Sequence, residues 1–444
     1  MTSVLSRPVR DHCLAPGRAG GAEMYAGRYG RLFPELPPLA LESEFLRVLG
    51  RRGGACDGGL GVEGESADAR EAAGWPIFGQ FIAHDIAADR SPVTHQAEPE
   101  RIRNYRTPRA NLESIYAGGP VGSPYLFDRA DDAKLLLGED GNDVPRNSQG
   151  VALIGDPRND VHLFMSQLHV VWLKLHNLLV YRLREDGADA AALFEEARRA
   201  ATWHYQWVIL FDFLPRAVGR ELVDELVAKG PTYFVPDGPE PFIPFEFADA
   251  AFRYGHSQIR HTYRLADVSE APLFPDLVGF RPVSARRVVD WSLLFDLRGH
   301  EPAQRAKKID GRLPRSLIDL PLEITGDVAD DDLHSLAVRD LERGSGVGLP
   351  SGEAVARRLG VEPLQGGELA LPDEWKGETP LWYYVLKEAE ARAGGDRLGP
   401  VGGRIVGEVL YGIVARDPES FLAVDPAWRP TLAPALADLL ALVA

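Results

Sequence analysis

The segment around residues 75–86 carries side chains that could do acid–base chemistry. Gln80 and His84 lie four residues apart and therefore share one face of a helix, whereas Asp85 is turned about 100° away. An imidazole is the side chain that can carry a proton near physiological pH. The spacing thus predicts one helix that faces two different sites.

A second segment, around residues 251–261, combines a histidine with cations. Arg253, His256 and Arg260 recur at helical spacing, which would place two guanidinium groups around one imidazole. Such a stripe suits an anionic cofactor that is held by the histidine. Taken singly, each histidine is more typical of a satisfied core or surface residue.

Helical periodicity dominates the chain that must position these residues. Residues 1–70 are rich in glycine and proline and predict an arm that wraps the body, whereas residues 71–444 predict one large, mainly α domain with few short β-strands. No repeat of 20 to 50 residues and no long linker divides this domain. The periodicity predicts helices over 42–49, 164–183, 190–214, 252–265, 333–343, 354–359, 380–391, 405–414 and a closing run to 444.

Composition excludes several classes of protein. With 65 acidic and 49 basic side chains, the chain has a net charge of −16, which disfavours nucleic acid as a partner. No stretch of 18 apolar residues is present, so we expect no membrane span. The first residues lack the apolar segment of a signal peptide, and we therefore expect a cytoplasmic protein.

The two segments and their neighbours resemble the animal-type haem peroxidase family, part of the peroxidase–cyclooxygenase superfamily. The resemblance covers roughly residues 25–430 and implies that 71–444 is a haem peroxidase catalytic domain with that family's helical fold. Its last motif is similar to that of bacterial members. The motifs occur in the family's order: GQFIAHDI, GDPRND, LHNLLVYRL, FRYGHSQI, LAVRDLERG with GLPSG, and LGPVGGRIVGEVLYG.

The resemblance assigns roles to four residues. His84 would be the distal acid–base residue, Arg158 its catalytic partner, Gln80 a distal-pocket neighbour and His256 the axial ligand of the haem iron. The implied function is an oxidoreductase that uses hydrogen peroxide to oxidise a small organic substrate through a ferryl intermediate, with a role in the response to oxidative stress. The alternative for Arg158 is a surface ion pair with a flanking aspartate.

The resemblance also describes the haem. Mammalian members form haem esters at two positions that are Ala83 and Val161 here, so it implies non-covalent haem b. Asp340 stands where the family usually has an asparagine behind the proximal imidazole, and a carboxylate there would lower the iron potential. Arg343 matches an arginine at one haem propionate, and Arg253 is a candidate for the other.

A calcium ion is the second cofactor that the resemblance implies. The family's calcium loop aligns with residues 107–113. Thr107, Arg109 through its carbonyl, Asn111, Glu113 and Asp85 would be its oxygen ligands, which suit calcium at six to eight positions. The loop departs from the family pattern at three places, and a plain polar loop is the alternative.

Two other functions remain open. A fatty-acid oxygenase of the same superfamily would need a radical-forming tyrosine three residues before the proximal histidine, but Arg253 stands there. We expect Tyr254, one residue off, to point elsewhere on the helix. A non-enzymatic haem-binding protein would have no use for the distal histidine and arginine.

Three histidines at seven-residue spacing, His162, His169 and His176, invite a metal-site interpretation. Seven residues of helix rise about 10.5 Å, which is too far for one shared ion. We therefore expect His169 and His176 to serve packing or hydrogen bonding, with His162 a candidate for the haem edge.

Overall fold

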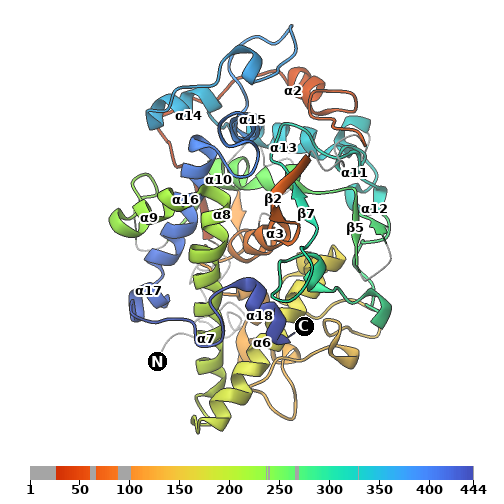
Figure 1. Cartoon of the computed structure of the whole chain (residues 1–444), viewed down its shortest axis with the longest axis vertical. Coiled ribbons are helices and arrows are strands. Elements are labelled where there is room, and N and C mark those ends of the chain that lie inside the picture. The colour runs from red at the N-terminus through yellow and green to blue at the C-terminus, as the bar shows by residue number, and fades with distance from the viewer. Residues whose placement is uncertain are drawn as a thin grey trace, which may run out of the picture.

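Helices far outweigh the short strands in the described chain and confirm the predicted mainly α fold (Figure 1). The computed structural model describes residues 27–60, 67–88, 102–236, 238, 241–265, 270–328 and 330–443. None of the helices within these ranges is long and apolar enough to cross a membrane.

The elements have the following bounds. The α-helices are α2 (Ser43–Gly50), α3 (Gly74–Ile86), α4 (Glu113–Tyr116), α5 (Gly119–Gly122), α6 (Leu163–Glu185), α7 (Leu193–Val208), α8 (Leu214–Val218), α9 (Arg220–Lys229), α10 (Phe245–Ala248), α11 (Arg315–Ile318), α12 (Leu322–Thr325), α13 (Leu336–Gly346), α14 (Gly352–Leu359), α15 (Leu381–Ala393), α16 (Pro400–Arg416), α17 (Phe421–Val424) and α18 (Leu436–Val443). The strands are β1 (Gly27–Gly30), β2 (Asp68–Ala72), β3 (Arg103–Asn104), β4 (Ile243–Pro244), β5 (Thr262–Arg264), β6 (Glu270–Pro272) and β7 (Arg305–Lys307). Two 3₁₀ helices bear on the site, η9 (Pro157–Asp160) and η11 (Ala251–Gln258).

Aromatic side chains fix helix α3 against α6 and α7. Phe81 of α3 stacks on Trp172 of α6, with ring centroids 6.1 Å apart, and meets Tyr205 of α7 edge to face at 6.0 Å. All three side chains are buried, and pairs of this kind add about 0.5–1.5 kcal/mol beyond the burial of their area. The packing therefore holds α3, which carries Gln80 and His84, in the middle of the molecule (Figure 1).

The strands form small sheets between the helices. One sheet has the order β3–β1–β4, in which β1 is antiparallel to β3 and parallel to β4, and the pairs β2–β7 and β5–β6 are antiparallel. Strand β2 leads directly into α3, so its pairing with β7 anchors the start of that helix.

The described part of the N-terminal arm lies along the body. Glu246 accepts hydrogen bonds from the backbone N–H groups of Leu32 (3.0 Å) and Phe33 (3.2 Å), and Leu39 donates to the carbonyl of Leu349 (2.8 Å). Helix α2 then packs on α13. The arm thereby supports the helix that carries Asp340, while residues 1–26 and 61–66 of the predicted arm lie outside the described residues.

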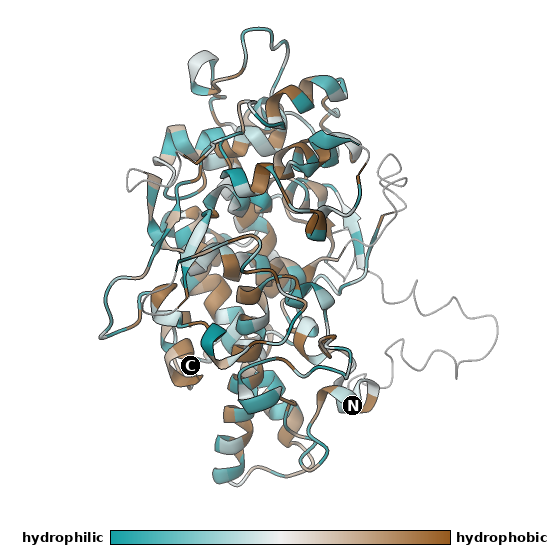
Figure 2. Ribbon diagram, turned by 90° about the vertical axis from the view of Figure 1, so that its right-hand side faces the viewer, coloured by the Kyte–Doolittle hydropathy of each residue, from teal (hydrophilic) through white to brown (hydrophobic). Residues whose placement is uncertain are grey.

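Glycine allows α16 to approach α15 closely. A Cβ atom added at Gly402 would lie 2.6 Å from Cγ1 of Val385. Hydrophobic segments are frequent along the central helices, whereas many peripheral loops are hydrophilic (Figure 2).

Two helix predictions need correction. The predicted helix over 252–265 is wrong beyond residue 258, because the chain forms the 3₁₀ helix η11, becomes extended at Ile259 and then enters β5. The predicted helix over 190–214 is instead α7 followed by a π-helical turn, Ile209–Phe213, that leads into α8. An apolar pattern over eight residues does not distinguish 3.0 from 3.6 residues per turn.

Candidate active site

A cavity of about 440 Å³ lies between α3 and η11 and collects the side chains that the sequence singled out. Gln80 and His84 line it from α3, Arg158 from η9, His256 from η11 and Arg343 from α13. The volume falls in the usual range of about 300–1,000 Å³ for cofactor and ligand sites.

Helix α3 presents the expected faces. Gln80 and His84 face the cavity, whereas Asp85 is fully buried on another side, where it accepts hydrogen bonds from the backbone N–H groups of Leu112 (2.9 Å) and Ser114 (3.0 Å). The structure therefore places these side chains on two different faces of the helix, as their spacing predicts.

His84 is held as a neutral imidazole. Its Nδ1 lies 2.8 Å from Oδ1 of the buried Asn159. Burial and the nearby charge of Arg158 lower the pKa of His84 to about 4, although the hydrogen bond to Asn159 opposes the shift. At neutral pH the ring is thus able to accept a proton.

Arg158 belongs both to the cavity and to an ion pair. Its Nε donates to Oδ1 of Asp156 (3.0 Å), and its Nη2 donates to Oδ2 of Asp156 (2.9 Å) and to the carbonyl oxygen of His84 (2.8 Å). Arg106 also binds Asp156. Burial would raise the pKa of Asp156, but the two arginines outweigh it and hold that pKa below the usual range. The ion pair expected as an alternative role therefore orients Arg158 beside His84.

A hydrogen bond to Asp340, on the side of the ring away from the cavity, orients His256. Its Nδ1 lies 2.6 Å from Oδ2 of Asp340, which leaves Nε2 as the nitrogen for a ligand in the cavity. Arg253 Nη1 donates to the other oxygen of Asp340 at 3.0 Å. Burial opposes ionisation of Asp340, but His256 and Arg253 outweigh it and lower the pKa of this carboxyl group. Asp340 is therefore a charged acceptor for the His256 ring.

The two remaining arginines of the predicted stripe act differently. Each nitrogen of Arg253 donates to protein oxygen, namely those of Ala248, Asp340 and Asp249, so the prediction that it binds an anionic cofactor group gains no support. Arg260 lies beyond the end of η11, pairs with Asp68 and does not line the cavity, which makes the expected two-cation stripe wrong. Its cause is the break of the helix at Ile259.

Arg343 remains on the cavity wall. Its Nε lies 3.1 Å from Oδ1 of Asp249, and it sits on α13, one turn after Asp340. The pair places a guanidinium group beside the cavity on the same side as His256.

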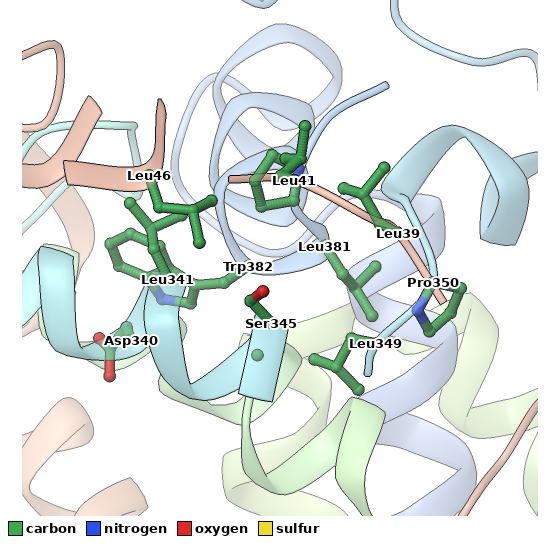
Figure 3. A pocket seen from close by; sticks show the side chains of 12 residues that line it. Leu39, Leu41, Leu46, Asp340, Leu341, Ser345, Leu349, Pro350, Leu381 and Trp382 are labelled. Atoms are coloured by element: carbon green, nitrogen blue, oxygen red, sulfur yellow. The ribbon is translucent and has the colours of Figure 1, made fainter. Parts of the chain in front are cut away.

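Asp340 borders a second, very small pocket of about 20 Å³. Leu46, Leu341 and Trp382 lie at the same end of this pocket (Figure 3). These apolar side chains from α2, α13 and α15 shield Asp340, which is 1% exposed. Low local polarity strengthens its hydrogen bond to His256.

Two further residues line the cavity. Tyr254 is buried and lies on its wall, as do all residues from 252 to 256, so the expectation that it points elsewhere than Arg253 stays a prediction. His162, the N-cap of α6, also lines the cavity, and its Nε2 is buried without a hydrogen bond. Burial lowers the pKa of His162 to about 3.

The other two histidines of the heptad spacing form hydrogen bonds. His169 Nδ1 lies 3.1 Å from Nδ2 of Asn159, and His176 binds the hydroxyl of Tyr116 and the carbonyl of Ala133. Within the described ranges, no three His, Cys, Asp or Glu side chains converge as metal ligands.

The predicted calcium loop is closed by its own hydrogen bonds. Glu113 accepts from the N–H and hydroxyl groups of Thr107, and Asn111 Oδ1 accepts from the N–H of Glu113 (3.1 Å). Arg106 Nη1 lies 3.6 Å from Glu113, and Arg109 points to Asp417. Burial raises the pKa of Asp85, the fifth predicted ligand, to about 6. The donor set does not fit a calcium ion in this arrangement, because a guanidinium group already supplies the positive charge.

Calcium removal is consequently expected to have little effect. Incubation with a chelator should leave the melting temperature unchanged, as measured by calorimetry. A drop in melting temperature that added Ca²⁺ reverses would show that residues 107–113 do bind the ion.

Several residues of the site were missed by the sequence analysis. Asn159 follows Arg158 in the GDPRND motif, and its polar type was the available signal, whereas Asp156 was expected only as a possible ion-pair partner of Arg158. Asp249 and Arg106 carry no motif of their own, since their partners Arg343 and Asp156 lie far away in sequence.

The chain is similar to a family of known proteins. A family model described as animal haem peroxidase matches residues 100–363. Thyroid peroxidase of Canis lupus familiaris is 26% identical over 383 residues, which cover 80% of this chain and 38% of that protein. Thyroid peroxidase of Homo sapiens is 33% identical over 139 residues, which cover 31% of this chain and 15% of that protein. The chain thus spans less than two fifths of the length of these relatives.

Solved structures share the fold. Peroxidase A from Dictyostelium discoideum superposes with a TM-score of 0.67 at 15% identity and covers 94% of this chain and 93% of that chain. A fatty acid α-dioxygenase of Arabidopsis thaliana superposes with a TM-score of 0.64 at 15% identity. The alignment covers 91% of this chain and 76% of that chain.

Proposed function

Because this chain belongs to the animal haem peroxidase family, we propose that it binds haem b non-covalently and uses hydrogen peroxide to oxidise a small organic substrate. The observation that carries the proposal is that His84 and His256 line one cavity from two different elements, each with its Nδ1 engaged by a buried partner. Both Nε2 atoms are thereby left for chemistry in the cavity.

The residues on the His256 side fit a haem group. His256 would hold the iron through Nε2, with Asp340 as the acceptor that strengthens this ligand. Arg343 would pair with a propionate, and Arg253 would keep Asp340 in place. When bound, the haem supplies the iron that exchanges electrons with peroxide.

The residues on the His84 side would move a proton. A neutral His84 can take the proton of peroxide at Nε2 and return it to the departing oxygen. Arg158, fixed by Asp156, adds a positive charge where negative charge develops, a contribution of about 2.7–4 kcal/mol for groups of this kind. Gln80 extends the same face and would hydrogen-bond water or peroxide.

The cavity wall suggests the character of the substrate. Apolar side chains make up much of the wall away from the histidines, among them Phe164, Leu273, Phe274, Leu317 and Leu320. An organic reductant with an aromatic or otherwise apolar body would bury its surface there.

The haem is expected to be removable. Ala83 and Val161 line the cavity but carry no carboxyl group to form an ester. Extraction with acidified butanone should therefore transfer all haem to the organic phase, as followed by absorbance. Haem that remains attached to the chain in mass spectrometry would contradict this prediction.

One observation supports a second function. Tyr254 lies on the wall of the same apolar cavity and could supply a hydrogen-atom acceptor to a fatty-acid oxygenase. Oxygen uptake with oleate or linoleate, abolished by Tyr254→Phe, would support this alternative. Oxidation of a phenol with peroxide, without oxygen uptake, would support the peroxidase.

A further inference from the structure

A chain of hydrogen bonds runs from His84 away from the cavity into the protein. Nδ1 of His84 lies 2.8 Å from Oδ1 of Asn159, and Nδ2 of Asn159 lies 3.1 Å from Nδ1 of His169. The three side chains come from α3, η9 and α6 and are all buried, with Asn159 completely inaccessible. An amide is thus placed between two imidazoles.

The amide couples the protonation sites of the two rings. Its oxygen only accepts and its nitrogen only donates. With Oδ1 towards His84, the hydrogen of that ring is on Nδ1 and the lone pair is on Nε2, in the cavity. His169 then accepts at Nδ1 and keeps its hydrogen on Nε2. Turning the amide around would put the hydrogen of His84 on Nε2 and remove its capacity to act as a base.

The surrounding structure stabilises this arrangement. Burial lowers the pKa of His169 to about 3, so this ring is neutral and able to accept from the amide. Asn159 donates its backbone N–H to the carbonyl of Asp156 (3.0 Å), in the same short helix whose Arg158 binds the carbonyl of His84. One 3₁₀ turn therefore holds His84 at both its ring and its backbone.

We propose that Asn159 and His169 are positioning residues that keep His84 in the Nδ1–H tautomer, with Nε2 ready to accept a proton from peroxide. The inference rests on the proposed function. A buried amide needs hydrogen-bond partners in any protein, so the test must separate control of the tautomer from general stability.

The chain offers a matched control. His176 lies on the same helix as His169, is equally buried and forms two hydrogen bonds, but it does not line the cavity or contact Asn159. His169→Phe and His176→Phe should cost similar stability. Only His169→Phe should alter the reaction with peroxide.

The first measurement is the second-order rate constant of the peroxide-dependent change in Soret absorbance, in haem-loaded protein. Asn159→Leu, which has a similar size and no acceptor, should lower it by about 10- to 100-fold, by analogy with the loss of a partner behind a metal-binding histidine. Asn159→Asp keeps an acceptor for Nδ1 and should stay much closer to the parent. His176→Phe should leave the rate constant unchanged.

The second measurement does not depend on turnover. In the carbon monoxide complex of the reduced protein, an N–H aimed at the ligand lowers the C–O stretching frequency, whereas a lone pair does not. The parent protein should show a high-frequency band, and Asn159→Leu and His169→Phe should add a band at lower frequency. His176→Phe should give the spectrum of the parent.

The outcomes distinguish failure of the proposed function from failure of the role given to Asn159 and His169. A parent protein that does not respond to peroxide would contradict the proposed function. A responsive parent with an unchanged rate constant or infrared band in Asn159→Leu would contradict the role of Asn159 alone. If Asn159→Leu fails to fold, the comparison of His169→Phe with His176→Phe decides, and equal effects of these two variants would overturn the proposal.

Discussion

Replacing His84 with alanine should slow the peroxide-dependent change in Soret absorbance by about 10² to 10⁴, the range for a lost acid–base group, while haem binding is retained. The reason is geometric. His84 is the residue on the cavity face of α3 whose Nδ1 is anchored and whose Nε2 is available, and its ring is neutral at pH 7. Stopped-flow absorbance with limiting peroxide and fully loaded haem measures the effect.

Two comparisons sharpen this prediction. Gln80→Ala removes a side chain from the same face of α3 but no proton carrier, so its effect should be far smaller. Arg158→Ala should also slow the reaction, and the double variant with His84→Ala should lose less than the product of the single effects, because both residues act on one step. A wild-type rate in His84→Ala would remove the acid–base role from this residue.

The rate constant for the reaction with peroxide should depend on pH through the protonation of His84. The base form of His84 dominates above its pKa of about 4 and is lost as the pH falls through that value. The rate constant of the parent should therefore decline on the acid side, and His84→Ala should lack this limb.

Replacing His256 with alanine should remove most of the bound haem. Its Nε2 is the only nitrogen on η11 that combines a place on the cavity wall with a buried carboxylate behind the ring. Haem titration followed at the Soret band should show weak or incomplete binding. Full Soret intensity with an unchanged ligand field would mean that another residue is the axial ligand.

Asp340→Asn is the control for His256. It keeps a side chain of the same size behind the imidazole but removes the negative charge, so haem should stay bound. The ferric/ferrous potential should rise, because the axial ligand becomes less electron-rich. Spectroelectrochemical titration measures this change, and a potential that stays the same or falls would contradict the role given to Asp340.

Spacing along one helix correctly predicted how three side chains of α3 are distributed over its faces. Gln80, His84 and Asp85 lie within six residues of α3, whose geometry alone decides that the first two share a face and the third does not. The apolar residues between them bury the helix on all other sides. In a regular helix, the direction of each side chain can be predicted from its position in the sequence.

The predictions failed where a regular helix was assumed and none formed. Arg260 lies away from the cavity because the chain becomes extended at Ile259. An eight-residue pattern does not reveal this change, since it depends on how the segment packs against α3 and α15.

Contacts between residues that are far apart in the sequence could not be predicted either. Asn159 stands in the motif that the sequence analysis used, but its contacts with α3 and α6 require the fold. The calcium prediction came from the family's aligned loop and its ligand types, and the position of Arg106 beside Glu113 and Asp156 argues against it. Residue types indicate which ion a site could bind, whereas the neighbouring charges determine whether its carboxylates still require a cation.

The central claim is that the cavity between His84 and His256 holds haem that reacts with peroxide. Stopped-flow mixing of the haem-loaded ferric protein with hydrogen peroxide tests it most directly. We predict a change in Soret absorbance whose rate rises linearly with peroxide concentration, and which a phenolic reductant reverses without oxygen uptake. No spectral response to excess peroxide, with haem fully bound, would contradict the account.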